Sequence, residues 1–232
     1  MFYVNGIDDA FSSHGTFNSS SWFRDYKNFS AKSKIDFYGL EKYAIDFLTK
    51  KLAKNLLYHG PHHTKDVLEA VEKIAFNERV TPEGFILLRA AVLFHDFGYI
   101  DKYKENEKIG ANYAREILPS YGFNTSQVTK ICDLIMSTRV PQKPNNQLER
   151  IICDADLDYL GRKDFLSISS NFYNELKDYD LVESKNEWDQ IQIKFIQNHH
   201  FFTEYSINKR SLLKKKNLEF IKDRALKNKY TK

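Results

Sequence analysis

The chain has 232 residues and a formal net charge of +4, because 35 lysines and arginines face 31 aspartates and glutamates. Hydrophobic residues make up 42% and aromatic residues 15% of the sequence, which excludes a wholly disordered chain. A mean hydropathy of −0.56 excludes an integral membrane protein, and only 9 glycines and 5 prolines argue against a collagen-like or turn-dense all-β chain.

Residues 1–34 differ in composition from the rest of the chain. Serine, glycine and asparagine alternate there with scattered aromatic residues, and no helical or strand period emerges. We therefore expect a loose N-terminal extension, with Trp22 and Phe23 as its anchors, followed by one domain over residues 35–232.

No targeting or disulfide signal accompanies this extension. The N-terminus lacks a basic region followed by an apolar run, so we expect no signal peptide. Cys132 and Cys153 form no CxxC pair, and two cysteines predict neither a disulfide framework nor a cysteine zinc site. The expected location is the cytoplasm.

From residue 38 onward the apolar residues recur at helical spacing. No alternating apolar and polar stretch is long enough for a strand, so the sequence predicts a compact all-α fold with roughly seven to nine helices. Residues 86–94 are apolar almost all round, as expected for a central buried helix. The apolar stripes are Tyr43, Phe47 and Leu48; Val67, Leu68, Val71, Ile74 and Ala75; Ile86 to Phe94; Ala111, Ala114 and Ile117; Val128, Ile131, Leu134 and Ile135; Leu148 to Leu160; and Ile191, Phe195 and Ile196.

The last predicted helix is strongly basic. Residues 209–232 contain 10 lysines and arginines against two acidic residues. Such a tail can meet nucleic acid or acidic lipid. We favour an amphipathic helix with Leu218, Ile221 and Ala225 facing inward and the lysines in water.

Three short segments place histidine and aspartate where the helical pattern calls for apolar residues. Buried imidazoles and carboxylates are costly unless they are paired or bound to a cation. Two histidines and two aspartates from three helices could converge on one divalent ion, and nitrogen and oxygen donors without thiolate suit Mn, Fe, Zn or Mg. A bound metal ion lowers the pKa of water, which is the equipment of a hydrolase that acts on phosphorus. The segments are residues 58–67, with His59 and His63; residues 93–99, with His95 and Asp96; and residues 153–159, with Asp154 and Asp156.

The succession of His63, His95-Asp96 and Asp156 resembles the motif of the HD-domain metal-dependent phosphohydrolases. The resemblance covers about residues 58–161, and it includes a His-Thr pair that opens a helix and an Ala-Asp-Leu that follows an apolar run. It implies an all-α fold, a divalent metal ion held by these four residues, and hydrolysis of phosphate esters.

A closer local resemblance links residues 58–67 to the class I cyclic-nucleotide phosphodiesterases. Tyr58-His59, His63 and Asp66-Val67 are similar to their Tyr-His-x-x-x-His-x-x-Asp-Val segment. The resemblance implies that His59 is the general acid, which protonates the leaving sugar oxygen, and that His63 is a metal ligand.

The third segment leaves two aspartates in competition for the metal. Residues 153–157 are similar to the Cys-Ala-Asp-Leu of the same phosphodiesterases, with one extra residue, Asp154. The order Ala155-Asp156-Leu157 matches that segment, so we favour Asp156 as the ligand and keep Asp154 as the alternative.

Three further residues are candidates for substrate binding. Gln192-x-x-Phe195-Ile196 is similar to the segment with which the phosphodiesterases clamp a purine, although core packing explains it equally well. Arg162 could pair bidentately with a substrate phosphate, and a surface salt bridge is the alternative.

The chain departs from the phosphodiesterases after its His-Asp pair. Phe97-Gly98-Tyr99 stands where those enzymes carry more histidines and acidic residues for a second metal ion, and the chain is much shorter than their catalytic domains. Glu107 is expected either to orient a water at the metal or only to occupy a first helical turn, where an acid is favoured.

These observations predict a metal-dependent phosphohydrolase, and within that class a phosphodiesterase that acts on a nucleotide, cyclic nucleotides included. The alternatives are a nucleotide phosphomonohydrolase and a non-catalytic nucleotide-sensing HD module; the intact His59 favours an enzyme, because a binder needs no proton donor. The expected partner is a small-molecule phosphate ester. We expect no membrane span and no specific nucleic-acid binding, because no run of basic and aromatic residues is present.

Overall fold

The computed structural model describes residues 19–230, so the earlier part of the predicted extension lies outside the described residues. Within 19–230 the chain forms ten α-helices and three short 3-10 helices, which confirms the all-α prediction with more helices than expected. The α-helices are α1 (Ser19–Lys32), α2 (Phe37–Lys51), α3 (Pro61–Asn77), α4 (Pro82–Phe94), α5 (Asn106–Ile117), α6 (Thr125–Ser137), α7 (Gln147–Asp156), α8 (Phe165–Asp178), α9 (Lys185–Asn198) and α10 (Glu204–Tyr230). The 3-10 helices are η2 (Phe97–Ile100), η3 (Leu118–Tyr121) and η4 (Asp158–Gly161).

Helix α1 lies within the segment that we expected to be loose, and Trp22 anchors it as predicted. The Trp22 ring packs edge-on against Phe76 and Phe85, and its indole N–H donates a hydrogen bond of 2.8 Å to the carbonyl oxygen of Val80. The side chain of Phe23 lies outside the described residues. A domain boundary at residue 34 stays a prediction.

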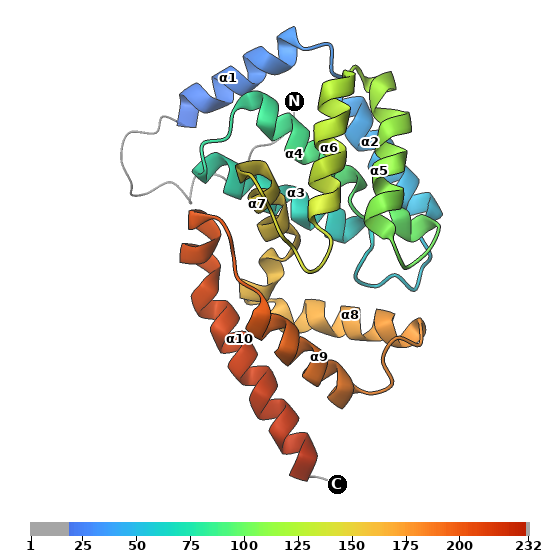
Figure 1. Ribbon diagram of the computed structural model, residues 1–232, viewed down its shortest axis with the longest axis vertical. Coiled ribbons are helices and arrows are strands. Elements are labelled where there is room, and N and C mark those ends of the chain that lie inside the picture. The colour runs from blue at the N-terminus through green and yellow to red at the C-terminus, as the bar shows by residue number, and fades with distance from the viewer. Residues whose placement is uncertain (1–18, 231–232) are drawn as a thin grey trace.

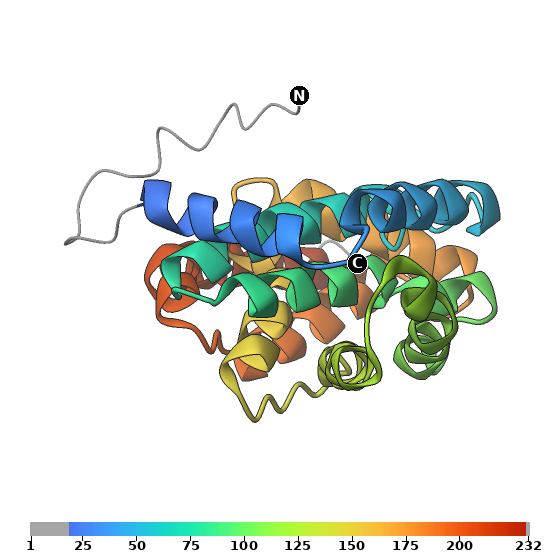
Figure 2. The same ribbon diagram turned by 90° about the horizontal axis from the view of Figure 1, so that it is seen from above.

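Helix α4 is the centre of the larger hydrophobic core. Its first turn begins with Pro82, and the Thr81 hydroxyl accepts a hydrogen bond from the backbone N–H of Gly84 as the N-cap. Nearly all of its residues are buried, because α1, α2, α3, α5, α6 and α7 all contact it. Figure 2 shows α1 and α2 on the opposite side of the molecule from α6, so α4 has neighbours on both sides.

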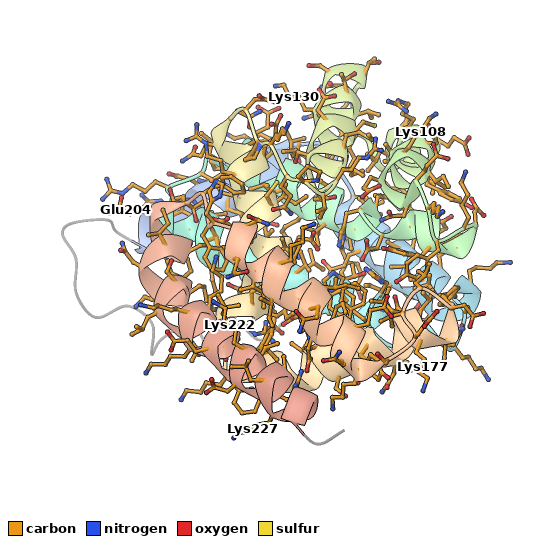
Figure 3. All side chains as sticks on the ribbon, turned by 60° about the horizontal axis from the view of Figure 1, so that its bottom comes forward. Lys108, Lys130, Lys177, Glu204, Lys222 and Lys227 are labelled. Carbon is orange, nitrogen blue, oxygen red and sulfur yellow. The ribbon has the colours of Figure 1, made fainter. Side chains whose placement is uncertain are left out.

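Helices α8, α9 and α10 lie below the other helices in Figure 1 and share a smaller core. Phe165, Ile196 and Ile221 are its centre. The inward positions predicted for α10 are confirmed, because Ile221 and Ala225 are buried and Leu218 packs against this core. Figure 3 shows lysines such as Lys222 and Lys227 along the outer side of α10.

The two cores meet at the segment between α2 and α3 and at the segment after α7. Tyr58, from the segment before α3, and Leu157, which follows α7, both belong to the smaller core. The predicted metal ligands and His59 lie beside this junction. None of the helices within residues 19–230 combines the length and the apolar character that crossing a membrane requires.

Candidate metal centre

Each of the four predicted metal ligands lies at a helix end. His63 is in the first turn of α3, which begins at Pro61 because the fixed φ of proline suits that position. His95 and Asp96 directly follow α4, and Asp156 is the last residue of α7. Because α3, α4 and α7 contact one another, these three ends bring their side chains to one place.

The four side chains converge at hydrogen-bond-like distances. His63 Nε2 lies 3.2 Å from Asp156 Oδ1 and 3.5 Å from Asp96 Oδ2. His95 Nε2 lies 3.2 Å from Asp96 Oδ2, 3.5 Å from Asp156 Oδ1 and 3.4 Å from His63 Nε2. All four side chains are at most 16% exposed. The ligand atoms of His63, His95 and Asp156 all lie within 4.8 Å of one another, and Asp96 Oδ2 lies against the two imidazole nitrogens.

The tautomer of His95 makes this point rich in electrons. His95 Nδ1 lies 2.7 Å from the carbonyl oxygen of Val92, which can only accept, so Nδ1 carries the hydrogen. In the neutral ring, Nε2 then directs a lone pair at two carboxylate oxygens. Asp96 Oδ2 is buried and has no hydrogen-bond partner. Such an arrangement needs a proton or a cation at its centre, and its nitrogen and oxygen donors fit a divalent metal ion.

The pKa shifts follow from the same crowding. Burial lowers the pKa of His95, but the carboxylates of Asp96 and Asp156 outweigh it and raise that pKa well above its usual value. Burial raises the pKa of Asp96 and of Asp156, yet the neighbouring histidines overcome this and lower both. The two carboxylates thus stay ionised although they are buried, and a positive charge must accompany them.

Asp154, the alternative ligand, points to a different partner. Its carboxylate accepts hydrogen bonds from the backbone N–H groups of Phe202 and Thr203, at 2.9 and 2.8 Å, and from the Thr203 hydroxyl at 2.6 Å. It is fully buried and ties α7 to the loop between α9 and α10. Of the two candidates, the structure brings Asp156 to the cluster.

His59, the predicted general acid, is held by a buried glutamate that sequence reasoning missed. His59 Nδ1 lies 2.5 Å from Oε1 of Glu175, which is 0% exposed and belongs to α8. Glu175 Oε2 accepts from the backbone N–H groups of Tyr58 and His59, at 2.7 and 3.0 Å. Burial raises the pKa of Glu175, but His59 and these N–H groups outweigh it, so the pKa is lowered.

A signal for Glu175 exists in the sequence but is weak. Phe165, Ile168 and Phe172 form an apolar stripe along α8, and Glu175 continues that stripe at helical spacing. A charged residue on the apolar side of a helix indicates a buried partner, yet nothing local indicates that the partner is His59.

Tyr99, from η2, lies against the other side of His59. The two rings stack with their centroids 4.0 Å apart and their planes at 24°, and the Tyr99 hydroxyl lies 3.0 Å from His59 Nε2. Because the rings are stacked, the hydroxyl lies over the imidazole face. The Tyr99 hydroxyl therefore does not occupy the in-plane direction of Nε2.

Asn106 and Glu107, in the first turn of α5, stand beside the cluster. The amide of Asn106 lies 3.4 Å from Asp96 Oδ1. Burial raises the pKa of Glu107, and the negative charges of Asp96 and Asp156 raise it further. This places Glu107 within electrostatic reach of two predicted ligands.

Arg162 is engaged by protein carboxylates. Its guanidinium donates to Asp66 at 2.6 Å and to both oxygens of Asp164 at 2.9 and 2.5 Å, and Asp158 lies 3.7 Å away. These pairs tie the start of α3 to the segment after η4 and engage all three guanidinium nitrogens. They match the salt-bridge alternative for this residue.

Gln192 and Phe195 lie in the smaller core. Gln192 is 4% exposed, its Oε1 accepts from the Ser169 hydroxyl at 2.5 Å, and its Nε2 lies 3.5 Å from Asp189. Phe195 packs against the smaller core and stacks on His199. The contacts described for this pair involve neither His59 nor the four predicted ligands.

Comparison with known proteins finds a solved structure that shares the fold of this chain. No family model matches the sequence, and no curated protein matches it either. Among solved structures, a predicted HD superfamily hydrolase from an uncultured Thermotogales bacterium matches with a TM-score of 0.51 and 20% sequence identity. The match covers 82% of this chain and 91% of that chain. At this identity it shows that the two chains share a fold, which is the fold that the motif resemblance predicts.

Proposed function

From this shared fold and the four-residue centre, we propose that the protein is a metal-dependent phosphohydrolase of the HD superfamily, and within that class a phosphodiesterase that acts on a nucleotide. The observation that carries the proposal is the convergence of His63, His95, Asp96 and Asp156 on one nearly buried point. The similar solved structure, that of a predicted HD superfamily hydrolase, supports the same class.

Several residues of the chain would prepare the centre for a cation. The Val92 carbonyl holds the hydrogen of His95 on Nδ1, which keeps Nε2 available as a ligand atom. Asp96 and Asp156 retain their negative charge, as their lowered pKa values indicate. A divalent ion held by these residues would polarise a phosphate and lower the pKa of a water molecule.

His59 would supply the proton for the leaving oxygen. Glu175 accepts the Nδ1 hydrogen, so it fixes the ring orientation and stabilises positive charge on the imidazole. The opposite nitrogen, Nε2, can then carry the proton that the ring donates. The ring centroids of His59 and His63 are 6.1 Å apart, which supports a donor close to the proposed metal ligands.

The choice of substrate rests on the sequence resemblance to the cyclic-nucleotide phosphodiesterases. The substrate contacts expected for Gln192 and Arg162 draw no support from the structure, because protein groups already occupy both side chains. A nucleotide phosphomonohydrolase would use the same centre. A nucleotide-sensing module would not need the His59–Glu175 pair, and that pair favours an enzyme.

A substrate screen with a matched histidine control tests the proposal. Metal-stripped protein receives Mn, Mg, Fe or Zn in turn, together with cyclic nucleotides, dinucleoside monophosphates or nucleoside monophosphates. We expect metal-dependent hydrolysis, and a diester preference identifies a phosphodiesterase. His59→Asn should keep the metal and lose about 10²–10⁴-fold in kcat. His62→Asn, at the exposed neighbouring residue, should retain full activity.

Two outcomes would contradict this function. Nucleotide binding without turnover under every metal would identify a sensing module. Equal activity of His59→Asn and the unaltered protein would remove His59 from the reaction.

A further inference from the structure

Tyr99 is fixed beside His59 by its backbone. Its N–H donates to the carbonyl oxygen of Asp96 at 3.1 Å in the turn that follows the two ligands. Gly98 packs so closely on α5 that a Cβ there would lie 2.2 Å from the carbonyl oxygen of Asn106. The turn therefore cannot shift easily, and the stack of Tyr99 on His59 is set by the same segment that carries His95 and Asp96.

The Tyr99 hydroxyl and His59 Nε2 can serve one acceptor. They are 3.0 Å apart, and two donors at that separation can both reach a single oxygen atom at hydrogen-bond distance. The stacking geometry helps, since the hydroxyl lies over the imidazole face and does not block the in-plane direction of Nε2. An oxygen atom in front of Nε2 would therefore lie within reach of both groups.

The hydroxyl keeps its hydrogen in this setting. A tyrosine hydroxyl has an ordinary pKa of about 10, so it is neutral near pH 7. A neutral phenol among carboxylates is a hydrogen-bond donor, and it is suited to a position where negative charge develops.

We propose that the Tyr99 hydroxyl is a second hydrogen-bond donor to the leaving oxygen that His59 protonates. The inference rests on the proposed function. As the oxygen of water bonds to phosphorus, the water gives up one proton to the solvent, and the bond from phosphorus to the leaving oxygen breaks with its electron pair passing to that oxygen. The leaving oxygen takes the proton from His59 Nε2. Tyr99 keeps its own proton and stabilises the developing charge through its hydrogen bond.

This role depends on the leaving group. An alkoxide from a sugar carries much negative charge in the transition state and gains from a second donor. A p-nitrophenolate leaves readily and delocalises its charge into the ring, so it gains little. A merely structural tyrosine would affect both substrates alike.

Tyr99→Phe tests the proposal, since it removes the hydroxyl and retains the stacked ring. We measure kcat for a dinucleoside monophosphate and for bis(p-nitrophenyl) phosphate. We expect kcat for the dinucleotide to fall about 10–100-fold, which is less than the loss measured for buried oxyanion donors. For the aryl ester, kcat should change by no more than about twofold. Tyr113→Phe is the control, because its hydroxyl contacts only Asp101 among the described interactions, on the exposed side of α5. It should leave both rates unchanged.

The possible failures are distinguishable. Equal losses on both substrates, or no loss on either, would overturn the role of Tyr99 while the phosphodiesterase proposal stands. Absence of hydrolysis of both substrates by the unaltered protein with every metal would overturn the proposed function, and the inference with it.

Discussion

A single backbone carbonyl, that of Val92, decides which nitrogen of His95 faces the two carboxylates. By accepting the Nδ1 hydrogen it fixes the tautomer and the ring plane together. Glu175 does the same for His59 through its Nδ1. Both histidines thus expose Nε2, one toward the predicted ligands and the other toward the predicted leaving group.

Substitutions of the two aspartates of α7 should have different effects on the amount of bound metal. Asp156→Asn should lose most of the bound metal, because it removes a charged ligand atom from the centre. Asp154→Asn should retain the metal and lose about 1–3 kcal/mol of unfolding free energy, because it disturbs the hydrogen bonds from Phe202 and Thr203. Elemental analysis and denaturant unfolding of both variants check this. Retention of metal by Asp156→Asn and its loss by Asp154→Asn would reverse the assignment.

The clustering of the four candidate ligands could be predicted from sequence because each lies inside a short motif. His63, His95 and Asp96 break an otherwise apolar helical pattern, and that break is visible locally. Glu175 could not be assigned in the same way, since 116 residues separate it from His59 and only the packing of α8 joins them. The direction of the Tyr99 ring is likewise a property of tertiary packing.

At the scale of elements, helix ends position the predicted metal ligands. The proline that opens α3 could be predicted as a helix start, so the placement of His63 in a first turn followed from sequence. Helix α1 was harder to predict, because serines interrupt the helical spacing of its apolar residues. Its position is fixed by Trp22, whose ring contacts α3 and α4.

Trp22→Ala should therefore show how much α1 contributes to stability. The change removes a buried ring and its hydrogen bond to Val80, and we expect a loss of about 3–5 kcal/mol in the free energy of unfolding. Arg24→Ala, at an exposed position of the same helix, should change it by less than about 0.5 kcal/mol. Denaturant unfolding of both variants provides the measurement. Similar costs for the two would show that α1 packs without stabilising the domain.

At the scale of the whole molecule, three helices of the larger core would be joined by one ion. Without a cation, Asp96 and Asp156 both lie against His63 in a nearly buried place, and protonated histidines must balance them. A ligand that binds only the folded state at 100 times its Kd stabilises it by about 2.7 kcal/mol.

Metal removal should accordingly lower the melting temperature. We expect excess chelator to lower the Tm of the unaltered protein by several degrees, with recovery when the preferred metal ion is restored. Asp96→Ala should melt at the same temperature with and without chelator. Thermal unfolding followed by circular dichroism gives both values. An equal response of the two proteins would mean that the ion acts elsewhere.

The global arrangement of the helices was the least predictable feature. Apolar periodicity indicated an all-α chain, because each helix shows its buried face locally. The docking of α10 depends on long-range pairs such as Asp189 with Arg224, and that of the loop before it on Asp154 with Thr203. A single sequence contains no local pattern that would predict contacts between residues so far apart.

The spread of the centre along the chain has a consequence for biosynthesis. A protein leaves the ribosome from its N-terminus, so His63, His95 and Asp96 emerge well before Asp156. A nascent chain that ends before α7 offers an ion two imidazoles and one carboxylate. The fourth predicted ligand arrives with the last residue of α7, and Glu175 follows only with α8. Tight metal uptake and the predicted proton donor would thus both await synthesis of the chain through α8, long after the first two ligand segments have left the ribosome.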